Sequence, residues 1–546
     1  MHAAASAALD APCGSIGKII MKTMKITKEF WLLAGIMAVA IFTRTYNLAA
    51  VPPGLWPDEA LNGVQAIQEP LKIFYPENQG REGLIMALDK LSFDALGVSM
   101  FAFRLVPAII GILTVLGVYL LALELFKPAF AKAMAGKEKT LALLAAFFVA
   151  TSFWHINFSR INFRAIMLPM VLVYSFYFLF LGMRKKSWWP FVASGLVFGT
   201  GFYTYTSFRL APVILFTVLF FWWLASKKEN GQKKFFGHSL LMLLATFFTA
   251  LPIGLYFLMG HMQDFFGRVG GISVFSQPNP LLAFLESLGL HLAMFNIYGD
   301  PNMRHNYSGD PQLFWPVGIL FLVGFFLMLK RGIFNFKQKN WKEFLPYITL
   351  FIWFFVMLLP GALTYEGMPH ALRVIGVIPA AYILAALGGV YLYGKLKIAI
   401  KNKAVLASIV VIFLVFSGIM PVCRYFCQWA RNPETANAFS KDLVAMGNFL
   451  KTSPDTYEKY VIMYGGDLPV QTVKLIALEN KNNKSIKYLW ASDIDSINPL
   501  GPAFVLFMEN NAADLQKLEN KYPNADLKPW IPEAPSKLWV YFINQP

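Results

Sequence analysis

The sequence predicts an all-α membrane bundle of about eleven transmembrane helices, followed by a small soluble α/β domain. Three observations support this fold class. Hydrophobic residues make up 57% of the 546 residues and charged residues only 14%, whereas about one-quarter of the residues in a soluble domain are charged. Apolar stretches long enough to cross a bilayer recur through the first 424 residues. Basic residues gather in alternate connections between these stretches.

The expected spans define a membrane domain at 30–424, preceded by a cytoplasmic segment at 1–29. Each span is expected to be a helix, because a helix satisfies the backbone polar groups of a segment in lipid within that same segment. The apolar runs lie at 30–48, 99–126, 140–157, 166–183, 188–206, 210–226, 238–259, 312–329, 345–363, 373–394 and 404–424.

The basic connections predict the orientation of the bundle. Half of the 48 Lys and Arg residues lie in connections that fall on one side of the membrane if the number of spans is eleven. These connections are 18–28, 127–139, 184–186, 227–234, 330–342 and 395–403. Because positive loops stay inside, we expect the N-terminus in the cytoplasm and the C-terminus outside the cytoplasmic membrane. The net charge of +17 is therefore assigned to topology, and no nucleic-acid partner is expected.

The connections expected outside the cell are longer and more acidic. The outer loop at 49–98 holds seven acidic and three basic residues, and its amphipathic stretches at 59–69 and 83–96 are expected to lie along the interface. A second long outer loop runs over 260–311. The tail at 425–546 predicts strands at Tyr460–Tyr464, Ile486–Trp490, Ala503–Met508 and Leu538–Ile543, with helices at 434–451, 469–480 and 512–521.

An acidic pair follows the first span directly. Three prolines and a glycine at 52–57 restrict the backbone just before Asp58 and Glu59. A carboxylate held at the membrane surface could remove a proton from an acceptor hydroxyl. Alternatively, Asp58 could simply cap a helix that begins at Glu59, although position 61 is Leu and supplies no capping-box partner.

Basic residues on the outer side form a second group of candidates. Arg160 and Arg164 are spaced i, i+4, so they would share one face of a helix. Outward arginines run against the positive-inside bias, and a bound phosphate would explain them because guanidinium matches phosphate oxygens. The alternative is that each arginine pairs with a nearby acid or reaches the headgroups. The other members of this group are Arg81, Arg104, Arg209, Arg268, Arg304, His305, His370 and Arg373.

A third candidate is the polar stretch at 299–311, which is dense in turn-forming residues. Its side chains could bind sugar hydroxyls or phosphate, or they could form a well-bonded turn. No Cys/His cluster has zinc spacing, and no Walker or Rossmann glycine pattern is present. We therefore expect no cofactor and no metal ligands; a divalent metal is possible but the sequence does not indicate one.

These motifs resemble the C-type superfamily of membrane glycosyltransferases over roughly residues 30–395. The likeness is greatest to the branch that contains protein O-mannosyltransferases and the aminoarabinose transferase that modifies lipid A. The motifs that carry it lie at 52–60, 103–107, 159–164, 299–306 and 369–373.

The resemblance implies a helical bundle with a cavity at the outer leaflet and a polyprenyl-phosphate sugar as donor. It assigns the role of catalytic base to Asp58, with Glu59 as its neighbour, and a phosphate-binding role to Arg81. That branch shows no obligatory metal, although oligosaccharyltransferase relatives use one. The remaining candidates for stabilising the leaving phosphate are Arg160, Arg164, Arg304, His305, His370 and Arg373.

The expected activity is therefore inverting transfer of a hexosyl or pentosyl group to a hydroxyl of a glycan, lipid or protein on the outer face of the cytoplasmic membrane. Two alternatives remain. A polyprenyl-linked glycan ligase or polymerase would use the same donors with another acceptor. A transporter of lipid-linked sugars would show related halves and a charge near the bilayer midplane, whereas the polar residues here gather at the outer rim.

Overall fold

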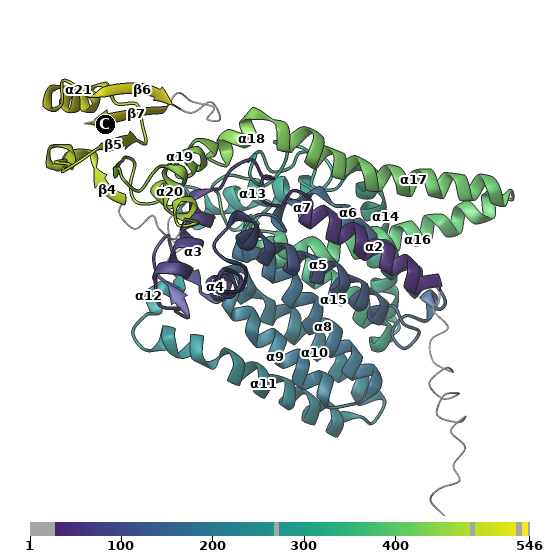
Figure 1. The fold of residues 1–546 in the computed structure, drawn as a ribbon. Coiled ribbons are helices and arrows are strands. Elements are labelled where there is room, and N and C mark those ends of the chain that lie inside the picture. The colour runs from purple at the N-terminus through teal and green to yellow at the C-terminus, as the bar shows by residue number, and fades with distance from the viewer. Residues whose placement is uncertain (1–27, 267–271, 481–485, 531–537, 544–546) are drawn as a thin grey trace, which may run out of the picture.

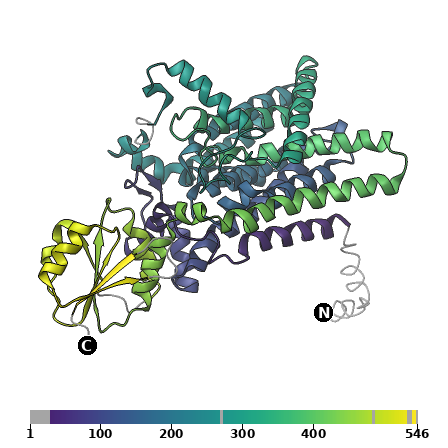
Figure 2. The same ribbon diagram turned by 90° about the horizontal axis from the view of Figure 1, so that it is seen from above.

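A helical bundle with a small α/β domain at one end makes up the structure (Figure 1, Figure 2). The computed structural model describes residues 28–266, 272–480, 486–530 and 538–543. In Figure 1 the first turn of the bundle's N-terminal helix lies at the opposite end of the molecule from the α/β domain.

Each predicted span coincides with a helix. The bundle helices are α2 (Lys28–Thr45), α5 (Met100–Leu125), α6 (Glu138–Thr151), α8 (Met167–Lys185), α9 (Trp189–Thr200), α10 (Ala211–Lys228), α11 (Gln232–Leu258), α14 (Trp315–Lys337), α15 (Trp341–Ala362), α16 (Ile378–Ala399) and α17 (Lys403–Cys423). Within the described part of the chain, eight helical segments are long and apolar enough to cross a membrane, by length and composition. The protein is thus a multi-pass membrane protein, and eleven spans remain a prediction.

Three predicted spans, α2, α6 and α9, are not among these eight segments, and each has a local reason. α2 carries the charged residues Lys28, Glu29 and Arg44. α6 has only 14 residues. It stops because Ser152 has an extended backbone and its Oγ accepts the N–H of His155, which starts the short α7 (Phe153–Phe158). α9 has 12 residues and gives way to the 3-10 turns η3 (Gly201–Tyr203) and η4 (Thr206–Leu210).

The centre and the periphery of the bundle are distinct. In α16 83% of the apolar window is buried by other parts of the chain, whereas in α17 the figure is 22% and in α11 it is 17%. α14 and α16 approach closely, because a side chain at Gly324 or Gly388 would collide with backbone atoms of the other helix. Small residues permit such contacts in membrane bundles. α11 and α17 therefore present most of their surface to lipid.

The first outer loop contains the two predicted amphipathic helices. They are α3 (Pro57–Gln68) and α4 (Leu84–Leu96), and the two-residue strands β1 (Phe74–Tyr75) and β2 (Arg81–Glu82) form an antiparallel pair between them. Both helices lie near the α/β domain in Figure 1. The second outer loop contains helices that the sequence analysis did not assign, namely α12 (Met262–Phe266), the 3-10 turn η5 (Val274–Ser276) and α13 (Pro280–Ala293).

The tail forms a five-stranded sheet in the order β4-β3-β5-β7-β6. β3 (Glu458–Met463) pairs in parallel with β4 (Ile486–Trp490) and with β5 (Ala503–Phe507), while β7 (Leu538–Ile543) is antiparallel to β5 and to β6 (Asp526–Trp530). Four of these strands match the predicted ones. β6 was missed, because its sequence, with Asp, Lys and Pro, is poor in strand-forming residues.

The helices of the tail largely follow the predicted pattern. α20 (Val470–Ala477) and α21 (Ala512–Lys521) lie where they were expected. The helix predicted over 434–451 was wrong as a single element. It is divided into α18 (Pro433–Ala438) and α19 (Lys441–Thr452), because Ser440 has a φ of 51° and cannot continue a right-handed helix.

The tail packs directly onto the first outer loop. α20 lies against α3, where the hydroxyl of Thr472 donates to the backbone oxygen of Leu55 at 3.1 Å. The side chain of Leu475 would lie 2.7 Å from a Cβ at Gly63. The carboxylate of Glu479 accepts the N–H of Met100 at 3.0 Å. The tail is therefore attached to the loop that carries the acidic pair.

Candidate active site

Asp58 lies in the first turn of α3, and it does not cap this helix. The N-cap residue is Trp56, and the carboxylate of Glu59 accepts the N–H of Trp56 at 3.3 Å. The alternative interpretation of Asp58 as a cap was therefore wrong. The helix begins two residues earlier than that interpretation assumed, with Trp56 as its N-cap and Glu59 as the acidic residue at position N3. Because Glu59 satisfies the helix terminus, the Asp58 carboxylate is left for another role.

Two neutral donors hold the Asp58 carboxylate. The indole N–H of Trp56 donates to one oxygen and the side-chain amide of Asn78 donates to the other. The Arg304 guanidinium lies 3.7 Å above the centre of the Trp56 ring and interacts electrostatically with Asp58. Asp58 is partly exposed. The carboxylate is thus oriented, accessible and close to a positive charge.

Glu59 points into the protein. Its side chain is fully buried, and its carboxylate accepts the backbone N–H of Asn162 at 2.7 Å. Burial raises the pKa of Glu59 to about 7, and the nearby Arg104 only partly opposes that shift. Glu59 therefore ties α3 to the segment after α7 instead of joining Asp58 at the surface.

A second buried carboxyl lies behind Glu59. The Asn162 amide donates to Asp89 at 2.7 Å, and burial raises the pKa of Asp89 well above its usual value. The sequence analysis did not select Asp89 or Asn162. A signal was present, because Asp89 falls on the stripe formed by Ile85 and Phe93, which is the buried face of α4.

Arg160 and Arg104 hold backbone carbonyls. Arg160 is fully buried and donates to the oxygens of Thr43, Tyr46 and Val51 at 2.7–3.1 Å. Arg104, also fully buried, donates to the oxygens of Leu48, Ala49, Pro52 and Gly54. These two side chains fix the connection between α2 and α3.

The predicted helical face shared by Arg160 and Arg164 was wrong. α7 ends at Phe158, and Arg164 starts the separate 3-10 turn η2 (Arg164–Ile166) after the extended residue Phe163. The break follows from Asn162, whose backbone and side chain are both engaged by buried partners. The two arginines consequently have different surroundings.

Glu82 is the centre of a basic cluster. It pairs with Arg164 at 2.8 Å and with Arg209 at 3.5 Å. For Arg164 the structure thus shows the pairing with a nearby acid that the sequence analysis had weighed against phosphate binding. The adjacent Arg81 donates to the amide oxygens of Asn62 and Gln65 and makes no ion pair within the described residues. Two guanidinium groups on the single Glu82 carboxylate leave an excess of positive charge.

Arg81 also interacts with the acidic motif. Burial and the neighbouring Arg164 together lower the pKa of Arg81 to about 10, and the carboxylates of Glu77 and Asp58 act in the opposite direction. A guanidinium with this pKa is still charged at neutral pH. Arg81 therefore feels the charge of both Arg164 and Asp58, so the basic cluster and the Asp58 carboxylate lie close enough to share one site.

Asp300 and His305 of the polar stretch at 299–311 form a group with His370, which comes from the connection between α15 and α16. The Oδ2 of Asp300 lies 3.0 Å from Nδ1 of His305 and 4.0 Å from Nδ1 of His370. Ligand atoms from these three residues lie within 4.8 Å of one another, and such a set suits a divalent transition metal. The same Asp300 carboxylate accepts the N–H groups of Asn302 and Ala371.

The sequence analysis named His305 and His370 as phosphate ligands and expected no metal ligands. It could not place His370 beside Asp300, because the two residues lie 70 positions apart in the chain. Arg373 binds away from this group, to Thr364 at 3.0 Å and to the backbone oxygen of Glu366 at 2.6 Å. Arg268 lies outside the described residues.

Comparisons with known proteins agree with this fold. A family model described as dolichyl-phosphate-mannose-protein mannosyltransferase matches residues 84–253. The crystal structure of ArnT from Cupriavidus metallidurans bound to undecaprenyl phosphate is similar over 97% of this chain and 98% of that one, with 13% identity and a TM-score of 0.51. The apo form of the same protein has 12% identity and a TM-score of 0.52.

The apo oligosaccharyltransferase of Archaeoglobus fulgidus is similar over 83% of this chain, with 15% identity and a TM-score of 0.48. This chain spans 64% of the length of that structure. A comparison with curated proteins finds no match. The family match and the shared fold confirm the resemblance to membrane glycosyltransferases of the C type and support a glycosyltransferase of this kind.

Proposed function

We propose that this protein is an inverting glycosyltransferase that moves a hexosyl or pentosyl group from a polyprenyl phosphate to a hydroxyl acceptor. The observation that carries the proposal is the Asp58 carboxylate, held by Trp56 and Asn78 beside the Arg304 guanidinium. The undecaprenyl phosphate in the Cupriavidus ArnT structure belongs to that protein. A polyprenyl-phosphate donor for this chain is part of our proposal.

In this reaction Asp58 takes the proton of the acceptor hydroxyl. The acceptor oxygen then forms a bond to the anomeric carbon from the face opposite the phosphate. The bond between that carbon and the phosphate oxygen breaks, and its electron pair leaves with the lipid phosphate. A pre-oriented base and fixed positive charges lower the barrier without any protein group having to reorganise.

Arg81 and Arg304 are the proposed partners of the leaving phosphate. Both have an electrostatic interaction with Asp58, and neither forms an ion pair with an acid within the described residues. Arg164 and Arg209 both pair with Glu82, which partly neutralises them, so their proposed contribution to stabilising the phosphate is smaller. Arg160 is proposed to position the loop, since its Nη atoms bond to backbone oxygens of the connection between α2 and α3. The Nη atoms of Arg81 bond instead to side-chain amides of α3, the helix that carries Asp58.

The proposed location of the reaction is the outer face of the cytoplasmic membrane. α3, α12 and the tail domain lie at one end of the molecule in Figure 1, and the first turn of α2 and the turn between α16 and α17 lie at the other. The basic connections at 18–28 and 395–403, which flank the start of α2 and the turn between α16 and α17, are expected in the cytoplasm. The tail and Asp58 would then face outward.

The test is release of lipid phosphate by purified protein incubated with a panel of polyprenyl-phosphate sugars and hydroxyl acceptors. We expect Asp58→Asn to lower the rate about 10²- to 10⁴-fold, because the amide cannot take the proton. The matched control is Asp94→Asn, an exposed acid of the same loop. An Asp58→Asn protein that folds normally and transfers at the full rate would remove Asp58 from the mechanism.

A further inference from the structure

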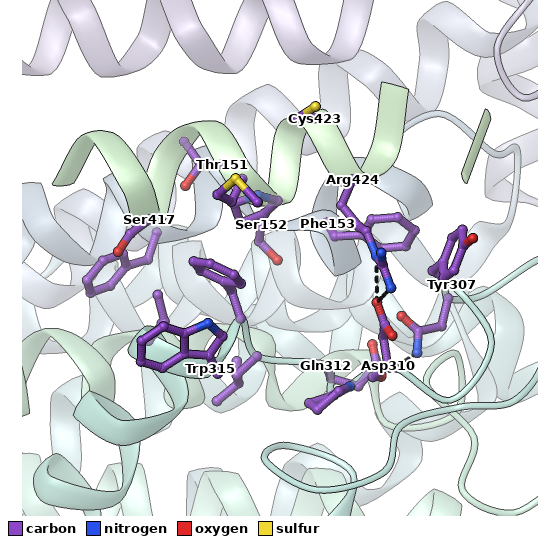
Figure 3. Close-up of a pocket in the computed structure, with 18 of the residues that line it drawn as sticks. Thr151, Ser152, Phe153, Tyr307, Asp310, Gln312, Trp315, Ser417, Cys423 and Arg424 are labelled. Carbon is purple, nitrogen blue, oxygen red and sulfur yellow. Dashed lines mark hydrogen bonds and ion pairs between the residues drawn. The ribbon is translucent and has the colours of Figure 1, made fainter. Parts of the chain in front are cut away.

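A cavity of about 330 Å³ lies between α6, α14, α16 and α17 (Figure 3). Its apolar wall includes Phe148, Phe153, Leu313, Phe314, Trp315 and Met420. None of Asp58, Arg81 and Arg304 contributes to its lining, although Asn306, Tyr307 and Asp310 of the polar stretch at 299–311 do. A volume of this size is in the range of small-molecule sites.

Two buried polar side chains line this cavity without a partner. Gln312 is 4% exposed, and within the described residues neither its Nε2 nor its Oε1 has a hydrogen-bond partner. Ser417 is 1% exposed, and its Oγ likewise has none there. A buried polar group left unsatisfied costs roughly 1–3 kcal/mol, so the two unpaired atoms of Gln312 indicate an occupant that can both donate and accept a hydrogen bond.

The cavity is amphipathic along its length. Ser417 and Trp315 lie at one end, and the ion pair of Arg424 with Asp310, at 2.6 Å, lies at the other (Figure 3). Seven residues of helix separate Ser417 from Arg424, which corresponds to about 10 Å. An occupant would therefore have hydrocarbon near Trp315 and polar atoms toward Arg424.

The cavity opens on the flank of the bundle that meets lipid. Its lining residues Trp315 and Met420 are 58% and 42% exposed, and α17 is among the least buried of the candidate spans. Apolar side chains exposed on such a helix face acyl chains in the membrane. An occupant can therefore enter sideways from the bilayer.

We propose that this cavity binds a membrane lipid by an acyl chain whose linkage carries both a hydrogen-bond donor and an acceptor, such as an N-acyl amide. An amide can accept from Nε2 and donate to Oε1 of Gln312 at once. An ester linkage offers only acceptors and leaves Oε1 unpaired. A polyprenyl chain offers neither and leaves both polar atoms of Gln312 buried without a partner.

The experiment uses the full-length protein in detergent with three diazirine-bearing probes, namely a ceramide, a phosphatidylglycerol and a polyprenyl phosphate. After illumination, labelled peptides are identified by mass spectrometry. We expect the ceramide to label peptides around 311–317 and 415–424 several-fold more strongly than the other two probes. The labelling should fall at least fivefold in Gln312→Leu, which keeps the volume of the side chain and removes both polar atoms.

Two further variants complete the test. Ser417→Leu fills the cavity from the opposite wall and removes a buried hydroxyl, so it should fold and also lose the labelling. Gln338→Leu, at the exposed end of α14, should label like the unaltered protein. Equal labelling of these peptides by the polyprenyl phosphate, unchanged in Gln312→Leu, would overturn the proposal. So would labelling no stronger than elsewhere on the lipid-facing surface, because water would then be the occupant.

Discussion

At the scale of single residues, the charged side chains of the outer loops fall into two groups. Arg104 and Arg160 are fully buried and donate to backbone oxygens, so they support the loop. Asp58 and Arg304 are oriented by neighbours that leave their charges available. Arginine occurs in both groups, so residue type does not separate them. Only the partners found in the structure separate them.

Glu59 predicts a pH dependence of stability. Its pKa in the folded protein is about 7, above the usual 4.5. The contribution of Glu59 to the free energy of unfolding is therefore most favourable below pH 4.5 and is lost as the pH rises through 7. The shift corresponds to roughly 3 kcal/mol. We expect Glu59→Gln to narrow the difference in unfolding temperature between pH 5 and pH 8, measured in detergent.

The control for this prediction is Glu434→Gln, because Glu434 is exposed at the start of α18. Asp89 also has a raised pKa, so some slope of the same sign should remain in Glu59→Gln. A variant whose stability changes with pH as steeply as that of the unaltered protein would show that Glu59 is charged in the folded state at pH 5.

Chelation tests the role of the group formed by Asp300, His305 and His370. Both oxygens of Asp300 already accept backbone N–H groups, and Oδ2 also lies 3.0 Å from Nδ1 of His305. We therefore propose that hydrogen bonds hold this group and that no metal is required. Treatment with EDTA should leave the transfer rate unchanged. A rate that falls with EDTA and returns with Zn²⁺ or Mn²⁺ would instead identify these residues as ligands.

At the scale of secondary-structure elements, α3 is held between the bundle and the tail. α20 packs on one side of it, and Glu59 bonds to the segment after α7 on the other. The backbone of Gly54, just before α3, meets the backbone oxygen of Phe439 in the tail without room for a side chain. The position of Asp58 therefore depends on the tail.

A methyl group at Gly54 tests this dependence. We expect Gly54→Ala to destabilise the protein by about 1–3 kcal/mol and to lower transfer, because the added Cβ would collide with the Phe439 carbonyl. Unfolding temperature and lipid-phosphate release are the measurements. Gly254→Ala in α11 is the control, since nothing lies within 4 Å of a Cβ there. Full activity of Gly54→Ala would show that the tail does not position Asp58.

The helices and strands themselves could largely be predicted, because hydrophobic period and composition act locally. The apolar run at 140–157 nevertheless breaks at Ser152, whose side chain caps the next helix. α13 was not predicted, although Asn279 caps it by accepting the N–H of Leu282 and Pro280 follows at its first position. Both residues are recognised start signals for a helix.

At the scale of the whole molecule, the distribution of Lys and Arg predicts the side on which each connection lies. The structure places α3 and the tail at one end and the first turn of α2 at the other, as this prediction requires (Figure 1). The membrane orientation itself remains a proposal. It places the candidate active site in contact with the cell exterior.

Cysteine labelling measures this orientation. After replacement of the three native cysteines, an impermeant maleimide should label Gln516→Cys in intact spheroplasts, because the tail is expected outside. Lys228→Cys, at the basic end of α10, should be labelled only after permeabilisation. The reverse pattern would place Asp58 in the cytoplasm and contradict the proposed reaction.

By itself the sequence determined that lipid is the main solvent of this protein, where its helices lie and which acidic motif follows the first of them. These properties depend on composition and on neighbours along the chain. The tertiary structure decided which arginines hold carbonyls, which acid joins two histidines, and that the tail supports the acidic loop. Such pairings connect distant positions, as Thr472 and Leu55 do across 417 residues. No local pattern encodes them.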